Sequence, residues 1–178
     1  MKKEMDSFVN LKVLRKATFK EAQGHKLIGL RWVLRKRKDL VKARLVAQEV
    51  NTGTWADAYA ATPTLIGQRV LAWVLLTKWR KNKLKYVMGV LDISTAFLHA
   101  NLPEGHKYFL RKPLYGLGAD DDCECYEAMK AVYGLRVAPR AFQEHFVMKV
   151  TEQNFRRSVA DPQIFIGIER FDGSFMTA

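Results

Sequence analysis

Cysteine is scarce in this sequence, and long hydrophobic runs are missing from it. The two cysteines, Cys123 and Cys125, stand too close together for an ordinary disulfide framework, so a small disulfide-rich secreted domain is excluded. No stretch reaches the roughly 18 apolar residues of a membrane span, and the opening MKKEMDSFVN lacks the apolar core of a signal peptide. These absences predict a protein of the cytoplasm or the nucleus with no membrane partner.

The sequence contains enough apolar residues to form the core of a folded domain. Its 178 residues are about one domain at roughly 150 residues per domain, and no internal repeat or low-complexity linker divides them. Hydrophobic residues make up 48% of the chain, which allows a sizeable core and excludes a chain that is disordered by composition.

Positive charge is concentrated in one segment. Thirty Lys and Arg against 18 Asp and Glu give a net charge of +12. Between residues 26 and 44 a single acid, Asp39, stands among eight basic residues: Lys26, Arg31, Arg35, Lys36, Arg37, Lys38, Lys42 and Arg44. Such a basic stripe is typical of a protein that binds a polyanion, here nucleic acid or nucleotide. A solvated face or a patch for an anionic membrane is the alternative.

The first third of the chain predicts one helix and one hairpin. Residues 4–20 favour a short helix, although their periodicity is poor. The runs 27–34 and 40–47 are rich in β-forming residues and predict a hairpin whose turn is the basic RKRKD. Small residues and turn formers then predict a loop over 48–63.

A helix and a buried strand are predicted next. Apolar residues recur with a helical period over 64–81, and Thr64 is a suitable N-cap. Trp73 and Trp79 on this helix are predicted to lie in the core. The nearly continuous apolar residues of 84–92 predict a strand covered on both faces.

The last third adds a loop, a helix and the start of a hairpin. Residues 103–130 include an acidic loop with glycine, and Pro139 predicts an amphipathic helix over about 139–153. The run QIFIGIE predicts a strand, and Asp172-Gly173 is a strong hairpin-turn signal. Together these elements predict a mixed α/β or α+β domain.

Asp92 at the end of the predicted strand is the main chemical candidate. An aspartate there would be held rigidly while its carboxylate reaches a cleft, which suits a hard cation such as Mg²⁺. The alternative is an aspartate that caps the following turn.

Four blocks of sequence resemble the reverse transcriptase of copia-type LTR retrotransposons, in order and in spacing. They are RWVLRKRKDLVKARLVAQEV, LDISTAFLHANLPEG, AVYGLRVAPRAFQEHF and SVADPQIFIG. The resemblance implies an α+β fold of the right-hand polymerase type, in which an antiparallel sheet is packed with helices. Residues 1–83 would form a fingers-like region with the basic hairpin 27–47, and residues 84–178 part of the palm.

The resemblance also implies a catalytic role for Asp92 and a selective one for Phe97. Asp92 matches the first metal-binding carboxylate of the palm, which would hold Mg²⁺ or Mn²⁺. Phe97 resembles the steric gate that excludes a 2′-hydroxyl and favours dNTPs. An ordinary core aromatic is the alternative for Phe97.

Phosphate and nucleic-acid contacts are implied for the basic hairpin. Lys42 and Arg44 match residues that grip the triphosphate, because Arg offers a bidentate fork and Lys a point charge. The adjoining cations Arg35, Lys36, Arg37 and Lys38 would contact nucleic acid. Solvated surface is the alternative for each of them.

The YGLRVAPRAF block is implied to line the nucleotide and template side of the site. Tyr133 and Gly134 would lie near the incoming base and sugar, since glycine permits close backbone approach. Arg136 and Arg140 would contact nucleic acid. The block departs from the common YGLKQSPRAW at several positions, and Ala138 in place of Ser removes a hydroxyl that could cap the next helix, worth about 1 kcal/mol.

Two further features are expected to be structural. Cys123 and Cys125, taken with His99 and His106, do not match the spacing of a structural zinc site. The acidic run within 120–127 lacks the alternation and closing glutamate of a calcium loop, which predicts a solvated loop.

The family's second carboxylate motif, a Y-V-D-D-like box, does not occur in the sequence, which reads FMTA where the strand before that box is expected. The sequence therefore predicts the fingers and part of the palm of an RNA-directed DNA polymerase, a fragment inactive alone. Its partners would be an RNA template, a DNA primer, dNTP and the remainder of a Pol polyprotein. A non-catalytic nucleic-acid-binding remnant and an inert fragment are the alternatives.

Overall fold

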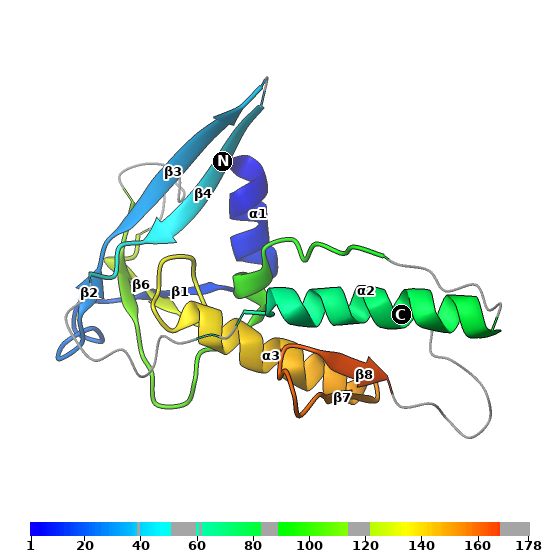
Figure 1. The fold of residues 1–178 in the computed structure, drawn as a ribbon. Coiled ribbons are helices and arrows are strands. Elements are labelled where there is room, and N and C mark those ends of the chain that lie inside the picture. Colours follow the sequence, from blue (N-terminus) through cyan, green and yellow to red (C-terminus); the bar gives the residue numbers. More distant parts are fainter. Residues whose placement is uncertain (39, 51–59, 61, 83–88, 114–121, 168–178) are drawn as a thin grey trace. The chain divides into compact units, whose positions relative to one another are not determined.

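The computed structural model describes residues 1–38, 40–50, 60, 62–82, 89–113 and 122–167. Within them the fold is mixed α+β, with three α-helices and several small sheets (Figure 1). Contacts divide the chain into two compact units. Unit 1 comprises residues 1–59 and 94–145, and unit 2 comprises residues 60–93 and 146–178. In the described part of the chain, no helix is long and apolar enough to cross a bilayer.

Unit 1 is built on a four-stranded sheet in the order β1-β6-β5-β2. Its strands are β1 (Leu14–Ala17), β2 (Leu27–Ile28), β5 (Phe109–Arg111) and β6 (Cys125–Ala128). The pairs β1–β6 and β5–β6 are antiparallel, and β2–β5 is parallel. The strands therefore join segments that lie more than 100 residues apart in the sequence.

Two predictions fail in this sheet. The helix predicted over 4–20 ends early, because α1 spans Lys2–Asn10, Lys12 has a φ of +51°, and β1 follows. A positive φ ends an α-helix, and the remaining residues find strand partners in β6. Residues 103–130, for which only an acidic loop was predicted, contain strands β5 and β6, and residues 114–121 lie outside the description.

The predicted basic hairpin is confirmed over residues 30–47, whereas residues 27 and 28 form β2 and pair with β5. Strands β3 (Leu30–Arg37) and β4 (Leu40–Ala47) pair along their whole length, in a register that opposes Arg35 to Lys42. The turn is shorter than RKRKD, since the first three of those residues continue β3. Lys38 lies in the turn with a φ of +47°.

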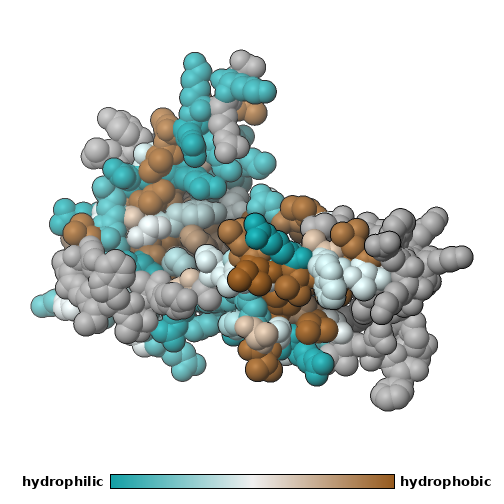
Figure 2. All heavy atoms as spheres, viewed as in Figure 1, coloured by the Kyte–Doolittle hydropathy of each residue, from teal (hydrophilic) through white to brown (hydrophobic). Residues whose placement is uncertain are grey.

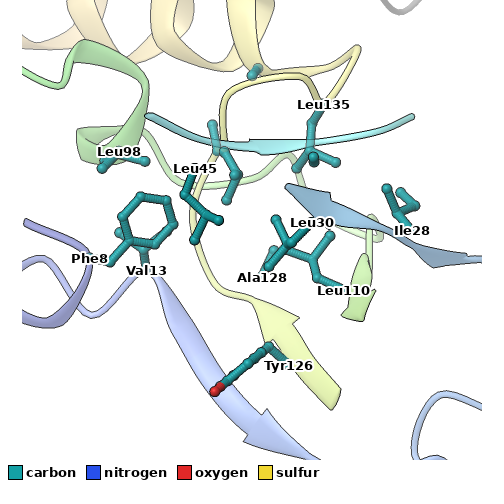
Figure 3. Packing of buried hydrophobic residues seen from close by; sticks show 14 of the residues in the cluster. Phe8, Val13, Ile28, Leu30, Leu45, Leu98, Leu110, Tyr126, Ala128 and Leu135 are labelled. Carbon is teal, nitrogen blue, oxygen red and sulfur yellow. The ribbon is translucent and has the colours of Figure 1, made fainter. Parts of the chain in front are cut away.

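The core of unit 1 lies where α1, the hairpin and the sheet meet. Figure 3 shows Phe8 of α1, Leu45 of β4 and Leu98 pointing toward one another. Leu45, Leu98 and Leu110 are each 0% exposed. Burying an aliphatic side chain of this kind contributes about 1.5–3 kcal/mol, so these contacts hold the hairpin on the sheet.

Unit 2 contains α2 (Leu65–Asn82) and an antiparallel pair, β7 (Phe155–Arg157) with β8 (Phe165–Gly167). The predicted N-cap is confirmed, because the Gly67 N–H donates to Thr64 Oγ1 at 2.9 Å. The Thr64 hydroxyl in turn donates to Asp161 Oδ2 at 2.9 Å. This chain of bonds joins the start of α2 to the turn before β8.

The prediction that Trp73 of α2 lies in the core is wrong, because this side chain is 66% exposed. Ile66 on the same helix is 72% exposed, and the side chain of Trp79 lies outside the described residues. A helical spacing of apolar residues predicts the helix but does not supply the element that would cover those residues.

The strand predicted over 84–92 is wrong for its described part. Residues 89–93 have no regular secondary structure, and Val90 is 92% exposed. A central strand needs partners for its N–H and C=O groups, and no described strand pairs with this segment. Residues 84–88 are outside the description.

The second predicted helix is confirmed, and each of its ends lies one residue earlier than predicted. Helix α3 spans Ala138–Glu152, with Pro139 in its first turn, and the boundary between the units falls within it after His145. The predicted strand near 163–169 is confirmed as β8, which pairs with β7. The predicted turn at Asp172-Gly173 and most of the predicted loop 48–63 lie outside the described residues.

Candidate nucleotide and nucleic-acid interface

The hairpin β3–β4 has one basic and one apolar face. Side chains alternate along a strand, so the register places Arg31, Arg35, Lys42 and Arg44 on one side. We call these four residues the basic face, and all four are exposed. The opposite side carries the buried Leu30 and Leu45. The core therefore fixes which way the cations point, and Figure 2 shows hydrophilic side chains along this hairpin.

The remaining hairpin cations lie elsewhere. Lys36 is opposite Val41 and belongs to the face of Leu30 and Leu45, though it is exposed beyond the core. Lys38 is exposed in the turn, and the side chain of Arg37 lies outside the description. The cations predicted as one group are thus distributed over two faces and a turn.

The turn at Tyr133 and Gly134 is docked on the end of β4. The Ala47 N–H donates to the Tyr133 carbonyl oxygen at 2.7 Å. Gly134 has a φ of +88°, and a Cβ added to it would lie 2.0 Å from the Ala47 carbonyl oxygen and 2.7 Å from Val46 Cγ1. Glycine is needed here for both reasons, since other residues disfavour this φ and β4 leaves no space.

Arg44 links the basic face to this turn. Its guanidinium carbon lies 5.3 Å from the centre of the Tyr133 ring. A guanidinium within about 6 Å of an aromatic face is attracted by the ring's quadrupole. The predicted phosphate ligand and the predicted sugar-side residue are therefore in contact.

Phe97 belongs to the same cluster. It lies in a 3-10 helix, η2 (Ala96–His99), that follows Thr95 at a φ of +54°. Its ring centre is 5.3 Å from that of Tyr133 and 6.0 Å from that of Phe142 on α3. Phe97 is partly buried against the core, so one side of the ring packs as a core aromatic would.

Glu49 is a residue of this site that the sequence did not single out. Its Oε2 accepts a hydrogen bond of 2.6 Å from the Arg136 N–H, which fastens the far end of the Tyr133 turn to the segment after β4. The one feature of the sequence that marks Glu49 is weak: Glu49 is the first acidic residue after the basic hairpin. Arg140, by contrast, forms an exposed ion pair with Glu144, 2.9 Å from Nε to Oε1.

Glu4 of α1 lies next to the cations of β4. Its pKa is raised by burial, although the Leu45 backbone and the charges of Arg44 and Lys42 act to lower it. Its Oε1 is buried and has no hydrogen-bond partner among the described residues. Unit 1 thus holds one carboxylate in an unfavourable setting close to its basic face.

Asp92 lies in unit 2, in the exposed segment 89–93. In the described ranges no group of three His, Cys, Asp or Glu side chains could hold a metal ion. Asp92 therefore offers one carboxylate, and these residues alone do not make a complete Mg²⁺ site.

Comparison with known proteins identifies the family. A model described as reverse transcriptase (RNA-dependent DNA polymerase) matches residues 16–174. The chain belongs to this reverse transcriptase family. The predicted resemblance to copia-type reverse transcriptases is thereby confirmed.

A curated relative agrees with this assignment. The retrovirus-related Pol polyprotein from transposon RE2 of Arabidopsis thaliana is 24% identical over 149 residues. The aligned region covers 79% of this chain and 10% of the relative, so this reverse transcriptase domain spans about a tenth of that polyprotein's length. No solved structure matches the chain.

Proposed function

We propose that this chain is the primer–template- and nucleotide-binding part of an RNA-directed DNA polymerase from a copia-type retrotransposon. The observation that carries the proposal is the basic face of β3–β4, whose four exposed cations continue through Arg44 onto the Tyr133 turn. Cations held on one side of a rigid ribbon suit a phosphate backbone, which supplies most of the affinity in nucleic-acid binding.

Within this proposal the chain divides as the family resemblance implies. Residues 1–83 act as fingers and residues 84–178 as part of the palm. Lys42, Arg44, Tyr133, Gly134 and Phe97 bind the nucleotide. Nucleic acid is contacted by Arg35, Lys36, Arg37, Lys38, Arg136 and Arg140.

Asp92 is proposed as one Mg²⁺ ligand of the complete polymerase domain. Mg²⁺ binds through one or two carboxylates together with substrate phosphates, so a single aspartate suits this partial role. The metal would supply charge stabilisation for nucleotidyl transfer, and other ligands must come from outside the described residues.

The test is primer extension on an RNA template with Mg²⁺ or Mn²⁺, combined with a binding assay on the same primer–template. The proposal expects tight binding by the chain and by its Asp92→Asn variant, and expects any extension to require Asp92. Failure to bind primer–template would refute the proposal.

A non-catalytic nucleic-acid-binding remnant is the second candidate, and the exposed position of Asp92 favours it. It predicts binding without extension, even when the chain is joined to the rest of a polymerase domain. Extension by such a joined protein that disappears with Asp92→Asn would exclude the remnant.

A further inference from the structure

Four side chains of unit 1 form a continuous series of contacts. Arg44 lies over Tyr133, Tyr133 packs against Phe97, and Phe97 meets Phe142 edge-on at an interplanar angle of 61°. The ring-centre distances of 5.3 and 6.0 Å lie within the range in which aromatic pairs attract. The members come from β4, the turn after β6, η2 and α3.

The backbone around Tyr133 is anchored at both ends of its turn. Ala47 binds the Tyr133 carbonyl oxygen, and Gly134 packs directly on β4. Glu49 holds the other end of the same turn through Arg136. The backbone that carries the Tyr133 ring is therefore fixed to the strand that carries Arg44, and the ring itself can respond to Arg44 by turning about its side-chain bonds.

We propose that Tyr133 is a positioning residue that couples phosphate binding at Arg44 to sugar selection at Phe97. This inference rests on the proposed function, in which Arg44 binds the triphosphate and Phe97 excludes the 2′-hydroxyl. A guanidinium that turns toward phosphate changes its contact with the Tyr133 ring. Because Phe97 packs on the same ring, its position responds, and sugar discrimination follows the state of Arg44.

Arg35 provides a matched control. It lies on the basic face with Arg44, it is exposed, and it stands opposite Lys42 in the register. Arg35→Gln and Arg44→Gln remove the same charge from the same face, but Arg44 is the one that lies over Tyr133.

The experiment measures the affinities of the full chain for dGTP, GTP and inorganic tripolyphosphate by calorimetry. Both variants should weaken tripolyphosphate binding by roughly two- to fivefold, the effect of an exposed charge pair. Arg44→Gln should also lower the dGTP-to-GTP preference by about twofold or more, the scale of an exposed cation–π contact. Arg35→Gln should leave that preference unchanged.

Repeating Arg44→Gln in two Tyr133 variants tests whether the Tyr133 ring carries the coupling. With Tyr133→Phe the preference should still respond to Arg44→Gln, because the ring remains. With Tyr133→Leu the response should disappear. Arg44 is exposed, so its own variant carries the test even where Tyr133→Leu does not fold.

The possible results distinguish a failure of the coupling from a failure of the proposed function. If Arg44→Gln weakens tripolyphosphate binding and leaves the dGTP-to-GTP preference intact, the coupling is overturned and the proposed function stands. If neither arginine affects tripolyphosphate, or no nucleotide binds, the proposed function fails and the coupling fails with it.

Discussion

Unit 1 and unit 2 carry different parts of the family's sequence motifs and hold them in different ways. Of the described residues, every buried hydrophobic side chain belongs to unit 1, where the basic face, Tyr133 and Phe97 are fixed by packing and hydrogen bonds. In unit 2, Asp92 is exposed, and so are most of the described apolar side chains of α2, among them Ile66 and Trp73. The family match extends over both units, whereas the buried core that holds motif residues in place lies, among the described residues, in unit 1.

The largest expected difference between the units lies in the core. Leu45→Ala in unit 1 should lower the free energy of unfolding by about 2–5 kcal/mol, because the site is fully buried and leaves a cavity. Ile66→Ala in unit 2 should change it by less than about 0.5 kcal/mol, because Ile66 is exposed. Urea unfolding followed by circular dichroism measures both, and equal losses would remove the distinction.

A glycine pair tests the docking of the Tyr133 turn. Gly134→Ala should cost about 3 kcal/mol, since it adds a clash with β4 to an unfavourable φ. Gly105→Ala shares the positive φ, at +79°, but its Cβ would meet nothing within 4 Å, so about 1 kcal/mol is expected. The same unfolding assay applies, and similar costs would mean that β4 yields to the added methyl group.

The helix cap in unit 2 should have a smaller effect. Thr64→Ala removes the oxygen that accepts the Gly67 N–H and should cost about 1 kcal/mol, whereas Thr64→Ser should restore most of it. Hydrogen exchange of the α2 amides reports this locally. Faster exchange throughout unit 1 as well would show that the two units unfold together.

The smallest effects differ in sign between the units. The raised pKa of Glu4 means that the folded state favours its protonated form, so stability falls as pH rises above about 4.5. Glu4→Gln should therefore stabilise the protein at pH 7 by less than about 1 kcal/mol, and this gain should vanish in acid.

Asp161 should behave in the opposite way. Hydrogen bonds from the Gln163 N–H and from Thr64 lower its pKa, so its contribution is present above about pH 4 and is lost as pH falls through the folded pKa. Asp161→Asn should destabilise at pH 7 and match the parent in acid. Thermal unfolding between pH 3 and 7 measures both variants, and parallel curves for the two would contradict the assigned environments.

Local signals explain which parts of the fold were predictable. The hairpin β3–β4, the Thr64 cap and the start of α3 near Pro139 each depend on residues close together in the sequence, and each was confirmed. Strands β5 and β6 were missed because β6 pairs with β1, over 100 residues earlier. The apolar residues of α2 predict a buried helix, yet only tertiary partners can bury them.

The candidate site shows the same division. The motifs identified Arg44, Tyr133, Gly134 and Phe97, but their contacts with one another depend on the docking of a turn onto β4, which no local pattern encodes. Glu49 could not be predicted from the sequence, because it acts through a hydrogen bond to the backbone of Arg136, 87 residues away. The separation of Lys36 from Lys42 required the strand register, since a shift of one residue exchanges the two faces.

The central claim is that nucleic acid binds through the basic face of unit 1, and the salt dependence of primer–template binding tests it most directly. The slope of log affinity against log salt reports the number of phosphates contacted. The double variant Arg31→Gln with Arg35→Gln, both on the basic face, should reduce that slope by about 2, one for each lost phosphate contact. Its matched control in unit 2, Arg69→Gln with Arg156→Gln, removes the same charge from exposed positions and should leave the slope unchanged. Equal reductions in the two double variants, or an affinity that does not depend on salt, would contradict the account.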